Sequence, residues 1–423
     1  MTSIGTRARS AANDRNSIVV AVLIVLALIY PWIVDSLLSL PVIGDFIPKT
    51  DSMVVMIAFT TMAIGLNMVV GYAGLLDLGY VAFYAVGAYT AGWFASQQFD
   101  QVSINIGAVG IPDDLPGIHI SMWLILPIAG LLTTLSGIAI GLPTLRLRGD
   151  YLAIVTLGFG EIIPQFVRNA DNLHGFDLTH GTFGISPIDA PGFGQKLHDT
   201  VGLPVRYDDS FPPTPDRLFF WTVLGILLVT IFCSVRLRDS RLGRAWIAIR
   251  EDETAAGAMG IPLMRTKTWA YAIGAFFGGV AGAYVATFNS GAFPSQFDFN
   301  ISIFLLCMVI LGGMGSIWGV VLAGTILAWL NVEGLANIGS WLNSNIFPAS
   351  HQIDVPKYEF GIYGVIIVLM MLFRPIGLIP ERRRKREIEE GTRGPLDEPL
   401  YEMRGADEPG AGERGESGRI PRG

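Results

Sequence analysis

The sequence predicts an all-α integral membrane protein with about ten transmembrane helices, some of them short or broken. Three observations support this fold class. Of the 423 residues, 51% are hydrophobic and only 15% are charged, well below the roughly 25% charged residues of soluble proteins. The 50 glycines suit close helix packing in lipid. Finally, apolar runs recur along the chain, most of them near the roughly 20 residues that cross a bilayer.

These runs give ten candidate spans, two of them short enough to suggest broken or re-entrant helices. The candidate spans are 18–38, 52–71, 75–96, 121–142, 151–168, 218–235, 269–288, 300–314, 316–334 and 359–373.

The distribution of Lys and Arg orients the spans, because short cytoplasmic loops collect basic residues. We expect a cytoplasmic N-terminus at 1–17, a transmembrane domain at 18–375 and an acidic external segment at 169–217. The loop 236–268 carries seven basic residues and is predicted to be cytoplasmic. Residues 376–423 are charged and rich in Pro and Gly, which predicts a disordered cytoplasmic tail.

The sequence shows no residues suited to catalysis. It has no G-x-x-x-x-G-K-[ST] phosphate loop and no His, Glu or Cys cluster with metal-ligand spacing. The five histidines all fall in predicted external loops, where scattered surface positions are the simplest interpretation. We therefore expect no enzyme and no bound cofactor, but a protein that moves a solute and is energised by another component.

The cytoplasmic loop contains a predicted amphipathic helix over residues 240–262. Ser240 is a suitable N-cap, and Gly260 followed by Pro262 is a suitable stop. The three- and four-residue spacing predicts one partly apolar face for Leu242, Trp246, Ile249, Glu253 and Ala256. Such a helix could dock in a groove of another protein or lie on lipid headgroups, and spacing alone does not choose between these.

Polar residues inside predicted spans are candidates for a solute pathway, because they are costly in lipid. Glu161 lies near mid-span beside Gly158 and Gly160, and the alternative for it is a packed, paired carboxylate. Asp77 follows a Gly-rich turn and could instead cap a helix end. Asn67 is suited to hydrogen bonding between helices.

Four blocks of sequence resemble the branched-chain amino acid permease family of ABC importers, of the LivM type. They include Gly71-Tyr72-Ala73-Gly74, the Leu147–Tyr151 block with Gly160-Glu161, the 241–284 stretch and Leu311-Gly312-Gly313-Met314-Gly315. Within 241–284, Glu253-Thr254-Ala255-Ala256 with Gly260 resembles the loop by which importer permeases dock on their ATPase. The resemblance covers most of residues 50–375.

The resemblance implies a permease subunit in a prokaryotic inner membrane, working by alternating access. It implies a second permease of the same fold, two cytoplasmic ATPases that hydrolyse the ATP, and an external solute-binding protein; membrane lipid surrounds the subunit and nucleic acid has no part. The residues it implies for ATPase coupling are Arg244, Ile249, Arg250, Glu251, Glu253, Ala256 and Gly260. The candidate pathway residues are Glu161, Gly158, Gly160, Asn67, Asp77 and Tyr80, where Tyr80 departs from the histidine usual in the family.

Other functions stay open at this point. A urea or short-amide importer shares the same sequence blocks. An ion-coupled secondary transporter would need more acidic and basic residues within the spans, and a non-transporting membrane subunit would produce no uptake defect when deleted.

Overall fold

The computed structural model describes residues 24–34, 38, 46–112, 115–147, 149–172, 175–193, 199, 206–207, 215–345, 354–374 and 376–379. The chain divides into the units Met1–Pro380 and Glu381–Gly423, and all described residues belong to the first. The predicted cytoplasmic N-terminus and, apart from residues 376–379, the predicted disordered tail lie outside the described residues.

Helices dominate the described part of the chain. After a helix at Ile24–Val34, the α-helices are α2 (Thr50–Asn67), α3 (Val81–Phe94), α4 (Met122–Thr144), α5 (Asp150–Arg168), α7 (Pro215–Asp239), α8 (Arg241–Glu251), α9 (Glu253–Ala258), α10 (Leu263–Phe288), α11 (Phe299–Gly312), α12 (Ile317–Trp329), α13 (Leu335–Asn345) and α14 (Glu359–Phe373). The short elements are the π-helices η2 (Met68–Tyr72) and η5 (Leu330–Gly334), the 3-10 helices η3 (Gly181–Phe183), η4 (Pro294–Phe297) and η6 (Val355–Tyr358), and the strands β1 (Ala95–Ser96), β2 (Ser103–Ile106) and β3 (Gly117–Ile120).

The predicted fold class is confirmed, since every candidate span contains a helix. Six described helices are long and apolar enough to cross a bilayer, and Ile24–Val34 and α11 are shorter apolar helices. Three predicted boundaries were wrong. The helix of the span predicted to begin at residue 269 already begins at Leu263. The span predicted to begin at residue 75 becomes helical only at Val81, and the span predicted to end at 334 continues through η5 to Asn345.

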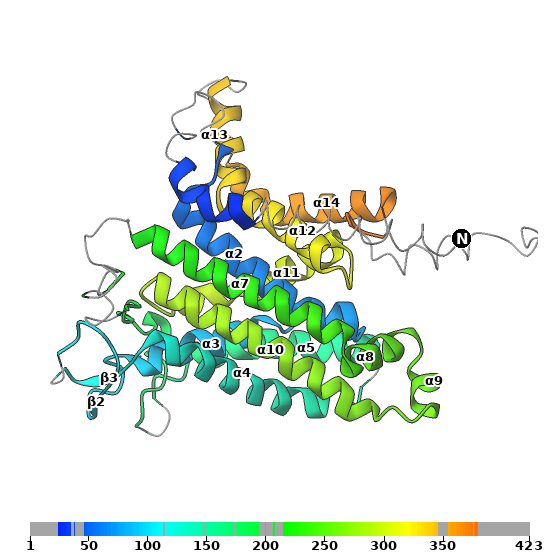
Figure 1. Cartoon of the computed structure of the whole chain (residues 1–423), viewed down its shortest axis with the longest axis horizontal. Helices are drawn as coiled ribbons and strands as arrows, with labels where there is room; N and C mark the ends of the chain where they lie inside the picture. Colours follow the sequence, from blue (N-terminus) through cyan, green and yellow to red (C-terminus); the bar gives the residue numbers. More distant parts are fainter. Residues whose placement is uncertain are drawn as a thin grey trace, which may run out of the picture. The chain divides into compact units, whose positions relative to one another are not determined.

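The centre of the bundle is formed by α2 and α10, whose spans are both 83% buried. Figure 1 shows α2, α3, α4, α7 and α10 running side by side, with the strands near one end and α8 and α9 near the other. Small residues allow this packing. A Cβ at Gly87 on α3 would overlap the carbonyl oxygen of Gly279 on α10, so the two backbones touch directly. By contrast, the span ending in α14 is only 6% buried within this chain.

A small sheet covers the end of the bundle opposite α8, in a segment for which no strands were predicted. Its strand order is β1-β3-β2, with β1 antiparallel and β2 parallel to β3. His119 on β3 is 1% exposed, and its Nδ1 lies 2.6 Å from Asp189 Oδ2. The surface interpretation of the histidines was therefore wrong for His119, because its imidazole joins the sheet to the segment that follows α5.

Candidate translocation pathway and coupling loop

A mostly buried stretch of non-helical backbone, residues 73–80, separates η2 from α3, and only Gly74 and Leu76 in it are exposed. Backbone N–H groups at membrane depth need partners inside the protein, because lipid supplies none. Two neighbouring helices supply them here. Thr156 Oγ1 on α5 accepts from Leu78 N at 3.1 Å, and Ser302 Oγ on α11 accepts from Val81 N at 2.9 Å. Residues 73–80, which we call the buried break, are thus held by helices distant in sequence.

Asp77 lies within the buried break and is 2% exposed. Its Oδ1 accepts from Gly79 N at 2.9 Å, which closes a turn ahead of α3; the helix N-cap itself is Tyr80. Its second carboxylate oxygen, Oδ2, has no hydrogen-bond partner among the described residues. The carboxylate therefore shapes the local backbone and faces inward rather than toward the surface of this chain.

Asn67 and Tyr80 tie the two ends of this region to other helices. Asn67, at the end of α2, is fully buried, and its Oδ1 accepts from Gly315 N in the α11–α12 turn at 2.9 Å. Tyr80 is also fully buried, and its hydroxyl donates to the Gly274 carbonyl of α10 at 2.7 Å. Both side chains act between helices, at positions no external solute reaches in this arrangement.

Glu161 and Gly158 lie elsewhere, on a face of α5 that the described chain leaves uncovered. Glu161 is exposed, and no hydrogen-bond or ion-pair partner for it lies among the described residues. A Cβ at Gly158 would meet nothing within 4 Å, and Ile154 and Ile162 on the same face are 64% and 57% exposed. Gly160 points the other way, with Leu78 and Gly79 of the buried break against it.

Glu161 lies about 17 Å along α5, the helix of the predicted span 151–168. A carboxylate at that depth of a span cannot face hydrocarbon cheaply. The uncovered α5 face therefore suits contact with another protein subunit or with a water-filled path. The six candidate pathway residues thus separate into two groups: Glu161 and Gly158 are available to such a path, whereas Gly160, Asn67, Asp77 and Tyr80 support the helices behind it.

The predicted coupling helix is two helices, which corrects the continuous helix expected over 240–262. Ser240 caps α8 by accepting from Gly243 N at 3.1 Å. Asp252 then adopts an extended conformation and caps α9 by accepting from the backbone N–H groups of Thr254 and Ala255. The start of α9 was not predicted, although Asp252 is of a residue type that strongly favours the N-cap position. Gly260, at φ +86°, ends the loop in the left-handed conformation that glycine favours.

The apolar face of the loop packs on this chain itself. Trp246 is fully buried, Ile249 and Ala256 are each 5% exposed, and Trp246 Nε1 donates to the Thr266 carbonyl at 2.8 Å. Glu253 pairs with Lys267 of α10 at 2.8 Å. The sequence analysis counted Lys267 only as a loop charge and so did not find this pair, in which Lys267 is buried and Glu253 is partly exposed.

Arg250 connects α8 to the core. Its guanidinium donates to the Gly71 carbonyl in η2, and Gly74, at φ +70°, leaves room for the Arg250 stem, which a Cβ there would crowd. Residues 240–262, which we call the coupling loop after their predicted role, therefore contact the backbone immediately before the buried break.

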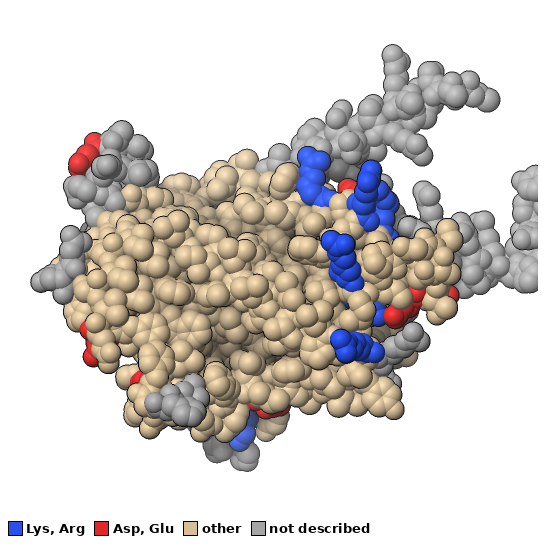
Figure 2. Space-filling view, turned by 90° about the horizontal axis from the view of Figure 1, so that it is seen from below, with Lys and Arg blue, Asp and Glu red and all other residues tan. Residues whose placement is uncertain are grey.

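The opposite side of the loop is open. Arg244, Glu251 and Gly260 are exposed, and Met259 is 85% exposed. Figure 2 shows Lys and Arg side chains gathered toward the end of the molecule where α8 and α9 lie. Of the seven residues predicted for coupling, Arg244, Glu251 and Gly260 can reach a partner, whereas Ile249, Arg250, Glu253 and Ala256 hold the loop in place.

Comparison with known proteins places this architecture in a family. Residues 50–371 match the family described as branched-chain amino acid transport system / permease component. The chain is 35% identical over 383 residues to the high-affinity branched-chain amino acid transport system permease protein LivM of Escherichia coli, covering 88% of this chain and 76% of that protein.

More distant relatives agree. The chain is 26% identical to the probable LivM permease of Methanocaldococcus jannaschii, covering 76% of this chain and 90% of the relative. It is 24% identical to the LivH permease of Escherichia coli, covering 76% and 91%. No solved structure matches. The protein is therefore a member of the branched-chain amino acid transport permease family, as the sequence blocks predicted.

Proposed function

We propose that this permease translocates branched-chain amino acids as one membrane subunit of an ABC importer in a prokaryotic inner membrane. In this proposal both termini are cytoplasmic and alternating access is driven by two separate ATPases, so the permease itself needs no cofactor. An external solute-binding protein delivers the amino acid. The names of the Escherichia coli relatives, both branched-chain amino acid transport permeases, support the solute class.

The geometry of the coupling loop supports the proposal that it docks on an ATPase. Its apolar face is occupied by α10 and the core, so the loop is rigidly anchored, while Met259 stands out at 85% exposure beside Gly260. An exposed large apolar side chain on an anchored loop is suited to fill a pocket of a partner. A movement of this loop would be transmitted to Gly71, because the Arg250 guanidinium donates to the Gly71 carbonyl.

We assign the second permease to the uncovered face of α5. Covering Glu161 and Gly158 with a related subunit removes the cost of a carboxylate facing lipid and places it along a path between two subunits. Escherichia coli has relatives named both LivM and LivH, which is consistent with a pair of different permeases.

Met259→Asp tests the docking, in vesicles that contain the permease with its partner subunits. We expect ATP-dependent leucine uptake to fall at least tenfold with unchanged insertion, because a charge replaces the apolar contact. Leu147→Asp is the matched control, since Leu147 is 37% exposed in the loop after α4 and lies outside the coupling loop. Normal uptake by the Met259→Asp variant would contradict the proposal that Met259 contacts the ATPase.

Labelled leucine and labelled urea test the solute in a strain that lacks this gene. Loss of leucine uptake that the intact gene restores supports the proposal. Loss of urea uptake with normal leucine uptake would instead favour the urea or short-amide alternative.

A further inference from the structure

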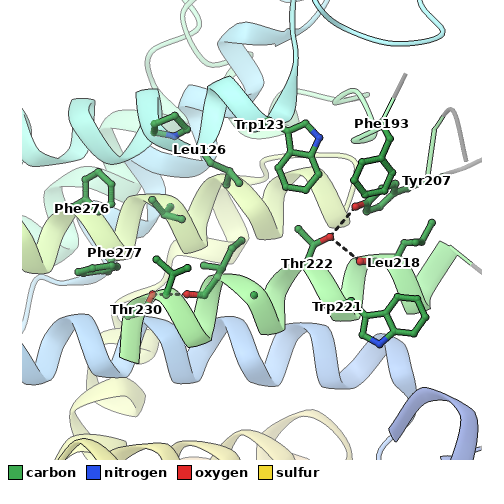
Figure 3. A pocket seen from close by; sticks show the side chains of 15 residues that line it. Trp123, Leu126, Phe193, Tyr207, Leu218, Trp221, Thr222, Thr230, Phe276 and Phe277 are labelled. Atoms are coloured by element: carbon green, nitrogen blue, oxygen red, sulfur yellow. Dashed lines mark hydrogen bonds between the residues drawn. The ribbon is translucent and has the colours of Figure 1, made fainter. Parts of the chain in front are cut away.

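A long apolar trough runs along α10, between α4 and α7 over its two larger hollows and beside α4 alone in the third. It consists of three adjoining hollows of about 710, 470 and 400 Å³. The first two share Phe276 and Phe277, and the last two share Trp269 and Ala272, so they form one continuous depression. We call it the α4–α7 trough; Figure 3 shows its largest part.

The largest part of the trough offers almost nothing to a polar solute. The hydroxyls of Thr222 and Thr230 donate to carbonyls of their own helix at 2.8 Å, as the dashed lines in Figure 3 show. Burial raises the pKa of Tyr207 to about 12, although its hydrogen bond to Thr222 acts in the opposite direction. The end near Tyr207 and Trp123 is therefore uncharged at neutral pH, and a zwitterionic amino acid would lose its hydration there without compensation.

The end of the trough nearest α8 is different, because two arginines border it. Arg236 lies in the last turn of α7 and lines the second hollow; Arg265 lies in the first turn of α10 and lines the third. Both are exposed, and no carboxylate partner for either lies within the described part of the chain. The nearby Arg238, in contrast, pairs with Asp239 at 3.1 Å.

The dimensions suit a lipid. From Arg265 to Val280, which lines the far hollow, α10 rises about 22 Å, which exceeds the roughly 15 Å of one leaflet of hydrocarbon. Basic pockets between transmembrane helices on the cytoplasmic side bind anionic headgroups, and apolar grooves accept acyl chains. The trough combines the two features.

We propose that the α4–α7 trough binds one anionic phospholipid, with its phosphate between Arg236 and Arg265 and an acyl chain along α10. The lipid would wedge α4 and α7 apart over α10 and hold them at a fixed spacing. This proposal does not depend on which solute the permease carries. The positive charge of Arg236 and Arg265 lies at only one end of the trough. This argues against a transmembrane helix of a partner as the occupant, since a helix would not require charged groups there.

Gly225 provides a direct way to fill the trough. It lines the largest hollow, and a Cβ at this position would meet nothing within 4 Å. Gly225→Leu should therefore occupy the acyl-chain space without distorting the bundle. Gly361→Leu on α14 is the matched control, because a Cβ there is equally unobstructed but lies outside the trough.

The experiment uses the purified full-length permease in nanodiscs of equal phosphatidylglycerol and phosphatidylcholine, with retained lipids counted by native mass spectrometry. We expect the unmodified protein and Gly361→Leu to retain phosphatidylglycerol at least fivefold over phosphatidylcholine. The double variant Arg236→Gln/Arg265→Gln should lose this preference, while Arg374→Gln, an exposed arginine after α14, should keep it. Gly225→Leu should retain less of both lipids.

Three results would overturn the proposal. One is unchanged phosphatidylglycerol retention in both Gly225→Leu and the double arginine variant. Another is an equal preference for the two lipids in the unmodified protein. The third is loss of the retained lipid whenever the second permease is bound, which would show that a partner helix occupies the trough. Leucine uptake is not the readout, so failure of the transport proposal and failure of this one are distinguishable.

Discussion

Removing either partner of the Glu253–Lys267 ion pair should destabilise the coupling loop, but by unequal amounts. The Lys267 side chain is 5% exposed and the Glu253 side chain 32% exposed. The buried ammonium group therefore needs its counter-charge more than the partly hydrated carboxylate does. Glu253→Gln leaves an ammonium group buried without a counter-charge. Lys267→Met leaves a carboxylate that water still reaches, and Met fills most of the vacated volume.

The magnitudes follow from this difference. Breaking a buried pair costs about 3–5 kcal/mol, and partial exposure of Glu253 reduces this to roughly 2–3 kcal/mol for Glu253→Gln. For Lys267→Met we expect about 1 kcal/mol or less. In the double variant neither charge remains, so its cost should be close to that of Lys267→Met alone.

Hydrogen–deuterium exchange of α9 measures these costs locally, because Glu253 begins that helix. At about 1.4 kcal/mol per tenfold, Glu253→Gln should speed α9 exchange roughly 30- to 150-fold. Lys267→Met should speed it about fivefold or less. Gly361→Leu on α14 serves as the unaffected control. Equal effects of the two single variants, or strictly additive effects in the double variant, would refute the assignment of burial to Lys267.

Three further predictions concern the core and the uncovered α5 face. Gly87→Val should prevent accumulation of folded protein, because its side chain would overlap α10 backbone, whereas Gly158→Ala should accumulate normally; fluorescence-detected gel filtration compares the two. Asn67→Ala should lower the unfolding midpoint by the equivalent of about 1–3 kcal/mol, because it leaves a buried backbone N–H at Gly315 unpaired; normal stability in a detergent denaturation series would contradict this. Glu161→Leu should leave expression unchanged but reduce leucine uptake several-fold, and should weaken co-purification of the second permease less than it weakens uptake; unchanged uptake would exclude this carboxylate from the path.

The span positions were predictable from sequence because apolar length is a property of each segment alone. The break at residues 73–80 was only partly predictable. The Gly-rich turn indicated an irregular stretch. Thr156 accepts from Leu78 within it and Ser302 from Val81 just after it, but both lie in other spans and are ordinary polar residues in apolar runs. No local pattern tells which distant hydroxyl meets which N–H group.

The coupling loop shows the same limit for the candidate site. Periodicity predicted one apolar face for Trp246, Ile249 and Ala256; the structure divides them between α8 and α9, and this chain buries all three side chains. Whether an amphipathic face packs on its own protein, on lipid or on a partner depends on tertiary contacts. The exposure of Met259 could not be predicted from sequence, because a single exposed side chain leaves no periodic pattern.

The buried break also has a mechanical consequence. Its ends and neighbours are joined to α8 by Arg250, to α10 by Tyr80, to the α11–α12 turn by Asn67 and to α5 by Thr156. A stretch with so many fixed points cannot serve as a soft hinge that bends while its surroundings stay still. We expect a displacement of α8 to tilt these helices together, so that a pathway opens at the rim of the bundle beside the uncovered face of α5, rather than within the bundle.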